Sequence, residues 1–164
     1  MAVGNLEFIK SASGTSVSSL SVTDCFSADY DVYYCTLEFE RSGASANQAN
    51  LLSFLNTSDA DSTANYDVAT LQLNFGAAFT ERRVTGYSNI LWITYDVDGA
   101  SGMYIYNPYS SSSYTFVTSQ AIGNNYGWKT IATHKASETV AGLKWTFNGT
   151  GQYDNIKVNV YGVK

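Results

Sequence analysis

Hydrophobic and polar residues alternate along much of this chain with a period of two. Residues 31–40 give the clearest example, because every second position there is apolar: Tyr33, Cys35, Leu37 and Phe39. Successive side chains of a β-strand point to opposite faces of a sheet. The alternation therefore predicts strands that bury one face and expose the other.

Similar stretches recur between polar breaks along the whole sequence. They predict about eleven short strands, at residues 6–12, 16–23, 31–40, 47–56, 66–75, 90–96, 102–107, 114–123, 128–136, 140–148 and 153–164. Many short strands separated by turn residues are typical of sandwiches and barrels. We therefore expect an all-β fold, a two-sheet antiparallel sandwich of jelly-roll type, formed by a single domain over residues 1–164.

Three segments in the middle of the chain carry more specific expectations. Residues 76–89 lack a period and predict an irregular connection or a short helical turn. Residues 90–96 are apolar on both faces, which predicts a central strand or one covered by a partner. Residues 66–75 place four apolar side chains on one face: Ala69, Leu71, Leu73 and Phe75.

The last segment, residues 153–164, predicts a strand that belongs to the core. Ile156, Val158 and Val160 alternate in it with polar residues. A terminal strand with such a face is fixed in the sheet and does not fray. We expect that removal of residues 155–164 unfolds the domain.

The composition also favours β-structure. Aromatic residues make up 15% of the chain, and charged residues only 14%, against roughly 25% in ordinary domains. Aromatic side chains suit the pleated, half-buried surface of a sheet. A chain of 164 residues is long enough to bury a core without disulfides or metal.

The charge of the chain limits the partners that we expect. Its net charge is −5, and its nearest approach to a basic patch is Arg82 and Arg83 beside Glu81. Nucleic-acid binding needs a positive patch that displaces counterions from phosphates. No apolar run approaches the ~20 residues of a membrane span, and residues 1–10 lack the pattern of a secretory signal. We expect no nucleic-acid partner and no membrane insertion.

Two cysteines lie within one predicted hairpin. A disulfide between Cys25 and Cys35 is geometrically possible there, but we expect two small buried thiols, which is the commoner environment of free cysteine. Two cysteines and one histidine without C-x-x-C spacing do not form a closed zinc site. The sequence therefore predicts no zinc.

The single histidine, His134, is the first candidate for catalysis. It stands beside Lys135 on a strand face that we expect to be exposed. Serine is abundant, but no G-x-S-x-G motif is present to activate one. We therefore expect a structural or surface histidine, with a catalytic base as the alternative.

Paired carboxylates occur at three places: Asp59 with Asp61, Asp96 with Asp98, and Glu38 with Glu40. Alternate aspartates near glycine can begin a calcium loop, but the segment after Asp98 lacks the closing glutamate. Glu38 and Glu40 share one strand face at about 7 Å, a spacing that a glycosidase could use. We expect solvated turns and surface acids, with no catalytic, cofactor-binding or metal-binding residue.

Aromatic residues near turns are the remaining candidates for a binding site. Tyrosine combines a flat apolar ring with a polar tip, which suits loop packing, a protein interface or a glycan site. Trp145 alternates with Leu143 and Phe147 and is predicted to lie in the core. The other candidates are Tyr87, Tyr109, Tyr114, Tyr126, Tyr153, Trp92 and Trp128.

Three stretches together resemble a domain of tailed-bacteriophage structural proteins, especially those of marine and cyanobacterial phages. Residues 8–40 contain a serine-spaced strand, a turn, and then Tyr30, Asp31 and Tyr33. Residues 102–118 contain a Y-N-P-x-S loop between two strands, and "IKVNVYGVK" resembles the chain ending of that family. The resemblance implies a β-sandwich virion protein, with no catalytic residues and no cofactor to transfer.

The resemblance also implies a non-enzymatic role on the surface of the particle. Because the domain begins almost at Met1, we expect a head decoration or cement protein, or a knob, and not a long self-standing fibre. The alternative is a tail-fibre or receptor-binding component, or a carbohydrate-binding module that recognises a host surface glycan.

The expected partners follow from that role. They are other virion proteins, either major capsid or tail proteins, together with further copies of the same chain. The first strand, at residues 6–10, is a candidate for pairing with a partner strand. We expect synthesis in the host cytoplasm and a final location in the virion.

Overall fold

A computed structural model describes residues 5–41, 49–76, 78–94, 97–148 and 151–164. Among them there is no helix that could cross a membrane. The described residues form twelve strands: β1 (Leu6–Val17), β2 (Ser19–Val22), β3 (Val32–Glu40), β4 (Asn50–Asn56), β5 (Tyr66–Asn74), β6 (Thr80–Tyr87), β7 (Ile90–Thr94), β8 (Asp98–Tyr106), β9 (Thr115–Gly123), β10 (Tyr126–His134), β11 (Val140–Phe147) and β12 (Tyr153–Val163).

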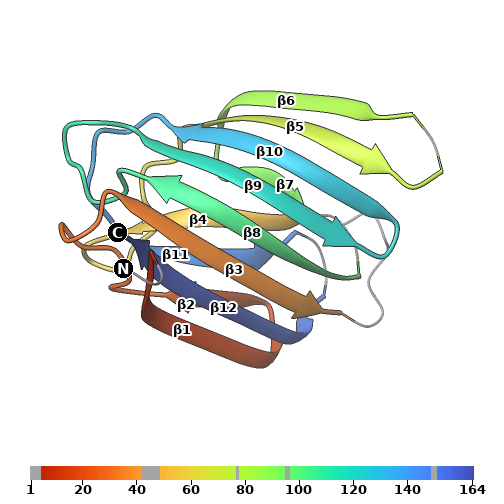
Figure 1. Cartoon of the computed structure of the whole chain (residues 1–164), viewed down its shortest axis with the longest axis horizontal. Coiled ribbons are helices and arrows are strands. Elements are labelled where there is room, and N and C mark those ends of the chain that lie inside the picture. The colour runs from red at the N-terminus through yellow and green to blue at the C-terminus, as the bar shows by residue number, and fades with distance from the viewer. Residues whose placement is uncertain (1–4, 42–48, 77, 95–96, 149–150) are drawn as a thin grey trace.

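The strands form two antiparallel sheets of different size. The larger sheet has eight strands in the order β1-β12-β3-β8-β9-β10-β5-β6, and the smaller has four in the order β2-β11-β4-β7. In Figure 1 the larger sheet lies in front of the smaller one, with β1 and β6 at its two edges. The prediction of an all-β, two-sheet antiparallel sandwich is confirmed, with twelve strands instead of about eleven. The jelly-roll type stays a prediction.

The core lies between the two sheets and follows the alternation of the sequence. In β3, Tyr33, Cys35 and Leu37 are 0% exposed, and Phe39 is 5% exposed. From the smaller sheet, Trp145 on β11 is also 0% exposed, which confirms its predicted place in the core. Both sheets thus direct every second side chain inward, as a sandwich requires.

The C-terminal strand β12 is an interior strand of the larger sheet. It pairs with β1 on one side and with β3 on the other. Ile156, Val158 and Val160 are at most 2% exposed, so the predicted core face is confirmed. Losing β12 would separate β1 from the rest of the sheet and open the core.

Two central segments differ from the sequence-based expectation. The expectation of an irregular connection over residues 76–89 is wrong for β6, which is a regular strand at the edge of the larger sheet. Among the described strands β6 pairs only with β5, and most of its residues are exposed, so it needs no apolar alternation. β7 is likewise an edge strand and not a central one. Its apolar residues Ile90 and Leu91 are nevertheless buried, because β7 contacts β5, β9 and β10 of the larger sheet.

The apolar face of β5 points outward. Tyr66 and Val68 are buried, whereas Ala69 is exposed, and Phe75, just beyond the strand, is 67% exposed. The inner positions of β5 include polar residues that have partners, such as Thr70, whose hydroxyl lies 2.9 Å from that of Thr130 on β10. Polar groups with partners tolerate burial, so the inner face of β5 can carry Thr70. The apolar residues Ala69, Leu71 and Leu73 lie on the opposite, outer face.

Truncating a β12 core residue should measure how strongly this strand supports the fold. Ile156→Ala should lower the free energy of unfolding by about 2–5 kcal/mol, because it removes buried methyl groups and leaves a cavity. The neighbouring exposed Lys157→Ala should change it by less than about 0.5 kcal/mol. Urea unfolding of both variants tests this, and a chain without residues 155–164 should show no cooperative transition.

Candidate binding face

One row of opposed residues crosses the outward face of the larger sheet from edge to edge. Strand pairing brings into register, from β1 to β6, Phe8, Tyr161, Tyr34, Tyr104, Thr118, Ile131, Ala69 and Arg83. The first four are aromatic and come from four adjacent strands. They form an aromatic row on the side of the sheet that faces away from the core.

The rings of this aromatic row contact one another in sequence. Phe8 lies 5.7 Å from Tyr161 between ring centroids, Tyr161 lies 6.4 Å from Tyr34, and Tyr34 lies 5.0 Å from Tyr104. Opposed aromatic pairs of this kind each stabilise a sheet by roughly 0.2–1 kcal/mol. Phe8 is 58% exposed and Tyr104 is 42% exposed, so the row remains available to a partner.

A glycine makes room for the ring at the centre of the sheet. Gly102 lies on β8 beside Tyr34, and a Cβ atom placed there would overlap the Tyr34 hydroxyl group. The absence of a side chain at Gly102 therefore lets the Tyr34 ring lie across β8. The rings of Tyr34 and Tyr104, which are 5.0 Å apart, are called the aromatic floor below.

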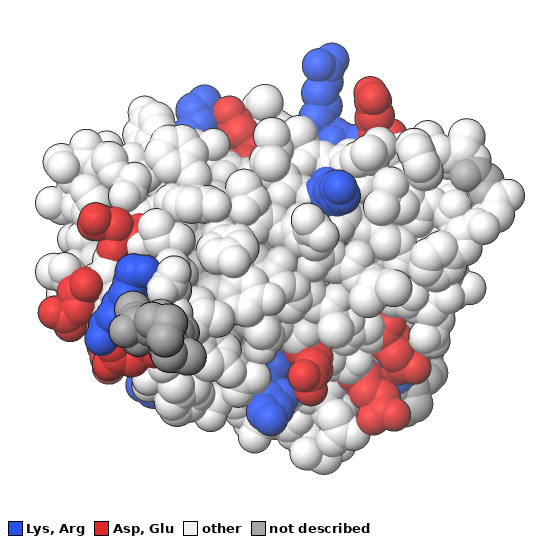
Figure 2. Space-filling view, viewed as in Figure 1, with Lys and Arg blue, Asp and Glu red and all other residues white. Residues whose placement is uncertain are grey.

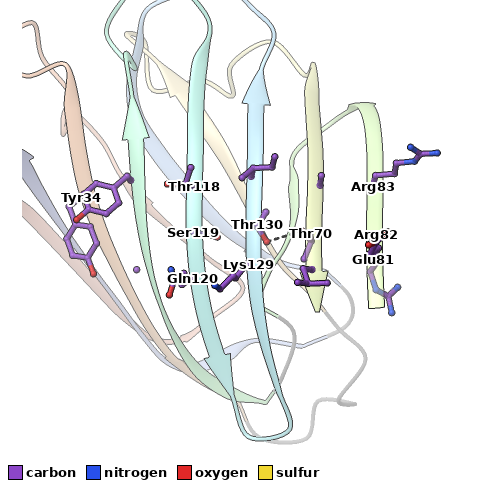
Figure 3. Close-up of a pocket in the computed structure, with 15 residues that line it drawn as sticks. Tyr34, Thr70, Glu81, Arg82, Arg83, Thr118, Ser119, Gln120, Lys129 and Thr130 are labelled. Atoms are coloured by element: carbon purple, nitrogen blue, oxygen red, sulfur yellow. Dashed lines mark hydrogen bonds between the residues drawn. The ribbon is translucent and has the colours of Figure 1, made fainter. Parts of the chain in front are cut away.

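The outward face is hollowed into a groove of about 1130 Å³ that extends from β3 to β6. Figure 3 shows its labelled side chains spread over neighbouring strands, with Tyr34 on one side and Arg83 on the other. Ala69, Leu71 and Ile131 supply apolar surface. The other side chains that the argument below uses are Tyr34, Tyr104, Thr118, Gln120, Lys129, Glu81 and Arg83.

Charge on this face is sparse. Figure 2 shows that the surface over β3, β8 and β9 is mostly uncharged. The groove carries charged side chains toward its β6 end, where Lys129 on β10 and Arg83 on β6 lie near Glu81. Within the described part of the chain, none of these three side chains forms an ion pair or hydrogen bond with another residue.

The edge strand β1 is a second exposed feature of the larger sheet. No described strand pairs with its outer edge, and Leu6 and Phe8 are 47% and 58% exposed. A register shift between Phe8 and Lys10 interrupts the strand, and Lys10 Nζ donates a hydrogen bond to the Thr23 carbonyl oxygen at 2.6 Å. Bulges and inward lysines protect edge strands from uncontrolled pairing. The segment of β1 before this bulge is therefore its most accessible part.

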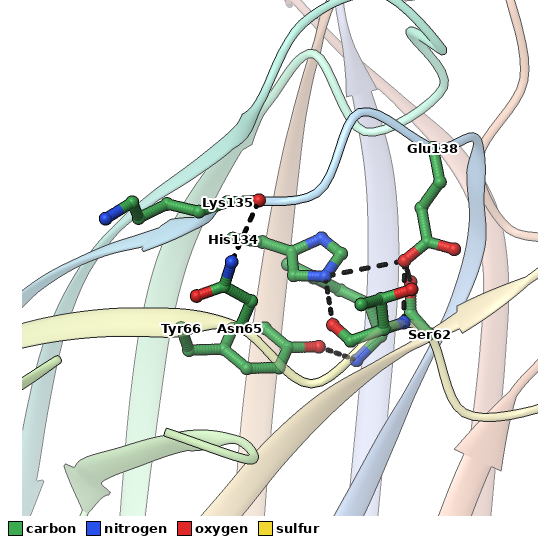
Figure 4. A network of polar contacts seen from close by, with 8 residues as sticks. Ser62, Asn65, Tyr66, His134, Lys135 and Glu138 are labelled. Atoms are coloured by element: carbon green, nitrogen blue, oxygen red, sulfur yellow. Dashed lines mark hydrogen bonds and ion pairs between the residues drawn. The ribbon is translucent and has the colours of Figure 1, made fainter. Parts of the chain in front are cut away.

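His134 lies inside the protein, so the expectation of an exposed strand face for it is wrong. It is 0% exposed at the end of β10, and its ring stacks on that of Tyr66 at 4.6 Å. Its Nε2 donates a hydrogen bond to the Thr63 carbonyl oxygen at 2.7 Å. Figure 4 shows how this ring lies between β5, the residues before it, and Glu138.

Ser62, Glu138 and His134 are close together, but not in the order of a catalytic triad. The Ser62 hydroxyl donates to Glu138 Oε1 at 2.5 Å, and Glu138 Oε1 lies 3.6 Å from His134 Nε2. A triad requires the serine to face the histidine, and the acid to face the other ring nitrogen. Here the carboxylate stands between the serine and the histidine, so the geometry is that of a structural network.

Burial governs the protonation of this network. It lowers the pKa of His134 below its ordinary value, although the Thr63 carbonyl and Glu138 act in the opposite direction. Burial pushes the pKa of Glu138 upward, but hydrogen bonds from Ser62 and Thr63, and the nearby His134, together hold it below its ordinary value. The fold therefore favours a neutral imidazole beside an ionised carboxylate.

The predicted carboxylate pairs lie apart from the groove. Asp61 forms an ion pair with Lys144 at 3.0 Å, and Glu40 accepts a hydrogen bond from Asn155 at 2.8 Å. Asp96 lies outside the described residues, and Asp98 accepts a hydrogen bond from Asn124 at 3.3 Å. Among the residues that the structure describes, no cluster of histidine, cysteine and acidic side chains could hold a metal ion.

The two cysteines are buried and not bonded to each other, as the sequence predicted. Burial raises the pKa of the Cys25 thiol to about 12, and it raises that of Cys35 well above the ordinary value. Reactive cysteines need an accessible thiolate. Neither thiol in this fold meets that condition.

No protein-family model matches the chain, and no curated protein matches it. Among solved structures, exo-inulinase from Aspergillus awamori aligns with 96% of this chain and 29% of its own, at 10% identity and a TM-score of 0.45. A fructofuranosidase from Schwanniomyces occidentalis complexed with fructosylnystose aligns with 96% of this chain and 34% of its own, at 6% identity and a TM-score of 0.28. The chain thus spans about a third of the length of these two solved proteins.

Several aromatic candidates from the sequence are unavailable for binding. Trp128 and Tyr153 are 1% and 0% exposed, so the expectation that they could serve a surface site is wrong. The side chain of Trp92 lies outside the described residues. The candidates that do reach the surface are Tyr87, Tyr109 and Tyr114, each about 40% exposed, and the half-buried Tyr126.

Sequence reasoning missed the tyrosines of the aromatic row. Tyr34, Tyr104 and Tyr161 each occupy the outward side of a strand, where polar residues were expected. A large aromatic residue on an otherwise polar face is the signal that could have found them. Their alignment into one row depends on strand register, which one sequence does not reveal.

The buried histidine predicts a loss of stability in mild acid. An unfolded histidine has a pKa near 6.5, and the pKa of folded His134 is lower. Above about pH 6.5 both states hold a neutral ring, whereas at lower pH the unfolded chain binds the proton more readily. The free energy of unfolding, measured in urea, should therefore fall between about pH 7 and pH 5.

The variant His134→Gln should reduce this pH dependence, because the chain has no other histidine. Its stability at about pH 7 should also be lower, since a packed ring is lost. NMR titration of the imidazole in the unmodified protein gives an independent check. A pH slope that persists in the variant, or an imidazole that titrates at 6.5 or above, would contradict the assignment.

Proposed function

We propose that this chain is a non-enzymatic structural protein of a bacteriophage virion, displayed on the particle surface and attached by protein–protein contacts. A head decoration or cement protein, or a knob, is the form of that role we favour. The observation that carries the proposal is the open edge of β1, where Leu6 and Phe8 are exposed and with which no described strand pairs. The resemblance of residues 8–40 and 102–118 to phage structural proteins supports the same role.

The β1 edge offers two kinds of contact to a neighbouring protein. Its free N–H and C=O groups can pair with an added strand, which supplies affinity through main-chain hydrogen bonds. Phe8 and Leu6 can fill pockets on the partner, and aromatic anchors of this kind contribute much of the energy of an interface. A second copy of the chain or a capsid or tail protein would meet both requirements.

The location of the chain tests the proposal directly. Cryo-electron microscopy of purified virions should find it on the capsid lattice, bridging or capping subunits of the major capsid protein. Density at a distal fibre tip would instead favour the receptor-binding alternative. Absence of the chain from the particle would contradict a virion role.

A carbohydrate-binding role is the second candidate, and the groove is the observation that favours it. Sugar sites combine a flat apolar surface with a few convergent polar groups. The groove offers the separate ring faces of Tyr34 and Tyr104, which are tilted by 49° to each other, with Thr118, Gln120 and Lys129 beside them. In a virion protein this site would recognise a host surface glycan.

A matched pair of phenylalanine variants tests the β1 edge. Phe8→Ser should weaken self-association, or binding to particles that lack the chain, by about tenfold or more, as loss of an aromatic anchor does. Phe79→Ser is the control, because Phe79 is 68% exposed near the opposite edge of the sheet. Sedimentation with particles and light scattering of the purified chain measure both effects, and equal losses in the two variants would reject β1 as the contact.

A further inference from the structure

We infer that the groove on the larger sheet binds an acidic oligosaccharide, one whose sugar units carry carboxylate or sulfate groups. The inference rests on the second candidate function, carbohydrate binding, and names its ligand class. It does not depend on the contact that we propose for β1. The features that carry it are the aromatic floor, the polar side chains along the groove, and two cations that have no partner among the described residues.

The aromatic floor provides the stacking surface for a sugar ring. Tyr34 and Tyr104 lie 5.0 Å apart between ring centroids, with an interplanar angle of 49°. The Tyr34 ring is held across Gly102, where any side chain would displace it. Tyrosine side chains have only two χ angles, so they lose little conformational entropy when a ligand covers them. The apolar face of a pyranose ring fits such a surface.

Polar side chains next to the floor can bind the sugar hydroxyl groups. Thr118 and Gln120 point outward from β9, one strand away from Tyr104 on β8. Figure 3 shows both side chains between Tyr34 and Lys129. A hydroxyl group and an amide can each donate and accept hydrogen bonds. They therefore match a ligand whose hydroxyl groups do both.

The cations at the other end of the groove select the charge of the ligand. Lys129 and Arg83 form no ion pair or hydrogen bond with any residue that the structure describes, although the chain as a whole has a net charge of −5. This end of the groove lining also contains Arg82 and the acidic residue Glu81. Cationic side chains therefore outnumber acidic ones here. A guanidinium group binds a carboxylate or sulfate with two parallel hydrogen bonds.

The same features argue against a protein as the occupant of the groove. The centre of a protein interface is depleted of lysine and glutamate, and this groove places Lys129 and Glu81 among its lining residues. Its volume of about 1130 Å³ slightly exceeds the roughly 300–1000 Å³ of pockets for single small molecules. That size fits several sugar units laid across neighbouring strands.

Three probes of six units each separate sugar recognition from simple charge attraction. They are a mannuronate hexasaccharide, mannohexaose as its uncharged counterpart, and hexa-L-glutamate as an acidic peptide. Calorimetry with the full chain should show that the mannuronate binds at least about tenfold tighter than mannohexaose, because hydrogen bonds between charged groups are stronger than those between neutral groups. Hexaglutamate should bind more weakly than the mannuronate, because it lacks rings that stack on Tyr34 and Tyr104.

Single substitutions then locate the site. Lys129→Ala and Arg83→Ala should each weaken mannuronate binding by about tenfold and mannohexaose binding by a clearly smaller factor, because only mannuronate offers them a charged group. Tyr104→Ala should weaken the binding of both sugars. Lys157→Ala is the matched control, since Lys157 is an exposed lysine on β12 outside the groove lining. Thermal unfolding of each variant verifies that it is folded.

The outcomes distinguish failure of this inference from failure of the functions proposed above. Equal affinity for mannuronate and mannohexaose would overturn the acidic ligand and retain carbohydrate binding. If hexaglutamate binds more tightly than mannuronate, both the acidic sugar ligand and carbohydrate binding are overturned. That result would point to an acidic protein partner. A failure to bind mannuronate, galacturonate and heparin hexasaccharides would also overturn the inference, while attachment through β1 would still be judged by the Phe8→Ser experiment.

Discussion

Strand register in the eight-stranded sheet is the constraint on which the rest of this structure depends. The pairing that sets Val158 opposite Leu37 in the core also sets Tyr161 opposite Tyr34 on the outside. Because side chains alternate with a period of two, a slip of one residue would exchange the two faces. Burial of the core therefore also fixes which residues stand opposite one another on the outer face, the aromatic row included.

The outward face divides into two regions with different chemistry. Near β1 it is an apolar edge, where Phe8 packs against Tyr161 and is still 58% exposed. Toward β6 it becomes a groove that combines rings, an amide and charged side chains. Large exposed apolar surface is costly in water and persists mainly where a partner covers it. The two regions suit different partners, a protein at the edge and a polar ligand in the groove.

Polar contacts between distant segments explain where the alternation pattern misleads. The inner face near β5 and β10 holds the Thr70–Thr130 pair and the His134–Thr63 hydrogen bond. Buried polar groups are tolerated when they find partners, and these partners lie 60 and 71 residues away in the chain. A histidine and a threonine that look like surface residues in the sequence are therefore interior residues in the fold.

The sequence by itself determined most of the strands but not β6, the two-sheet sandwich, and the core faces of β3 and β12, because spacing along one strand decides which side chains share a face. It also identified Trp145 as a core residue and both cysteines as buried. Only the tertiary structure decided that β6 and β7 lie at edges, that the apolar face of β5 points outward, and that Phe8, Tyr34, Tyr104 and Tyr161 form one row. These features depend on pairing between segments far apart in the chain, and local periodicity carries no information about which strands become neighbours.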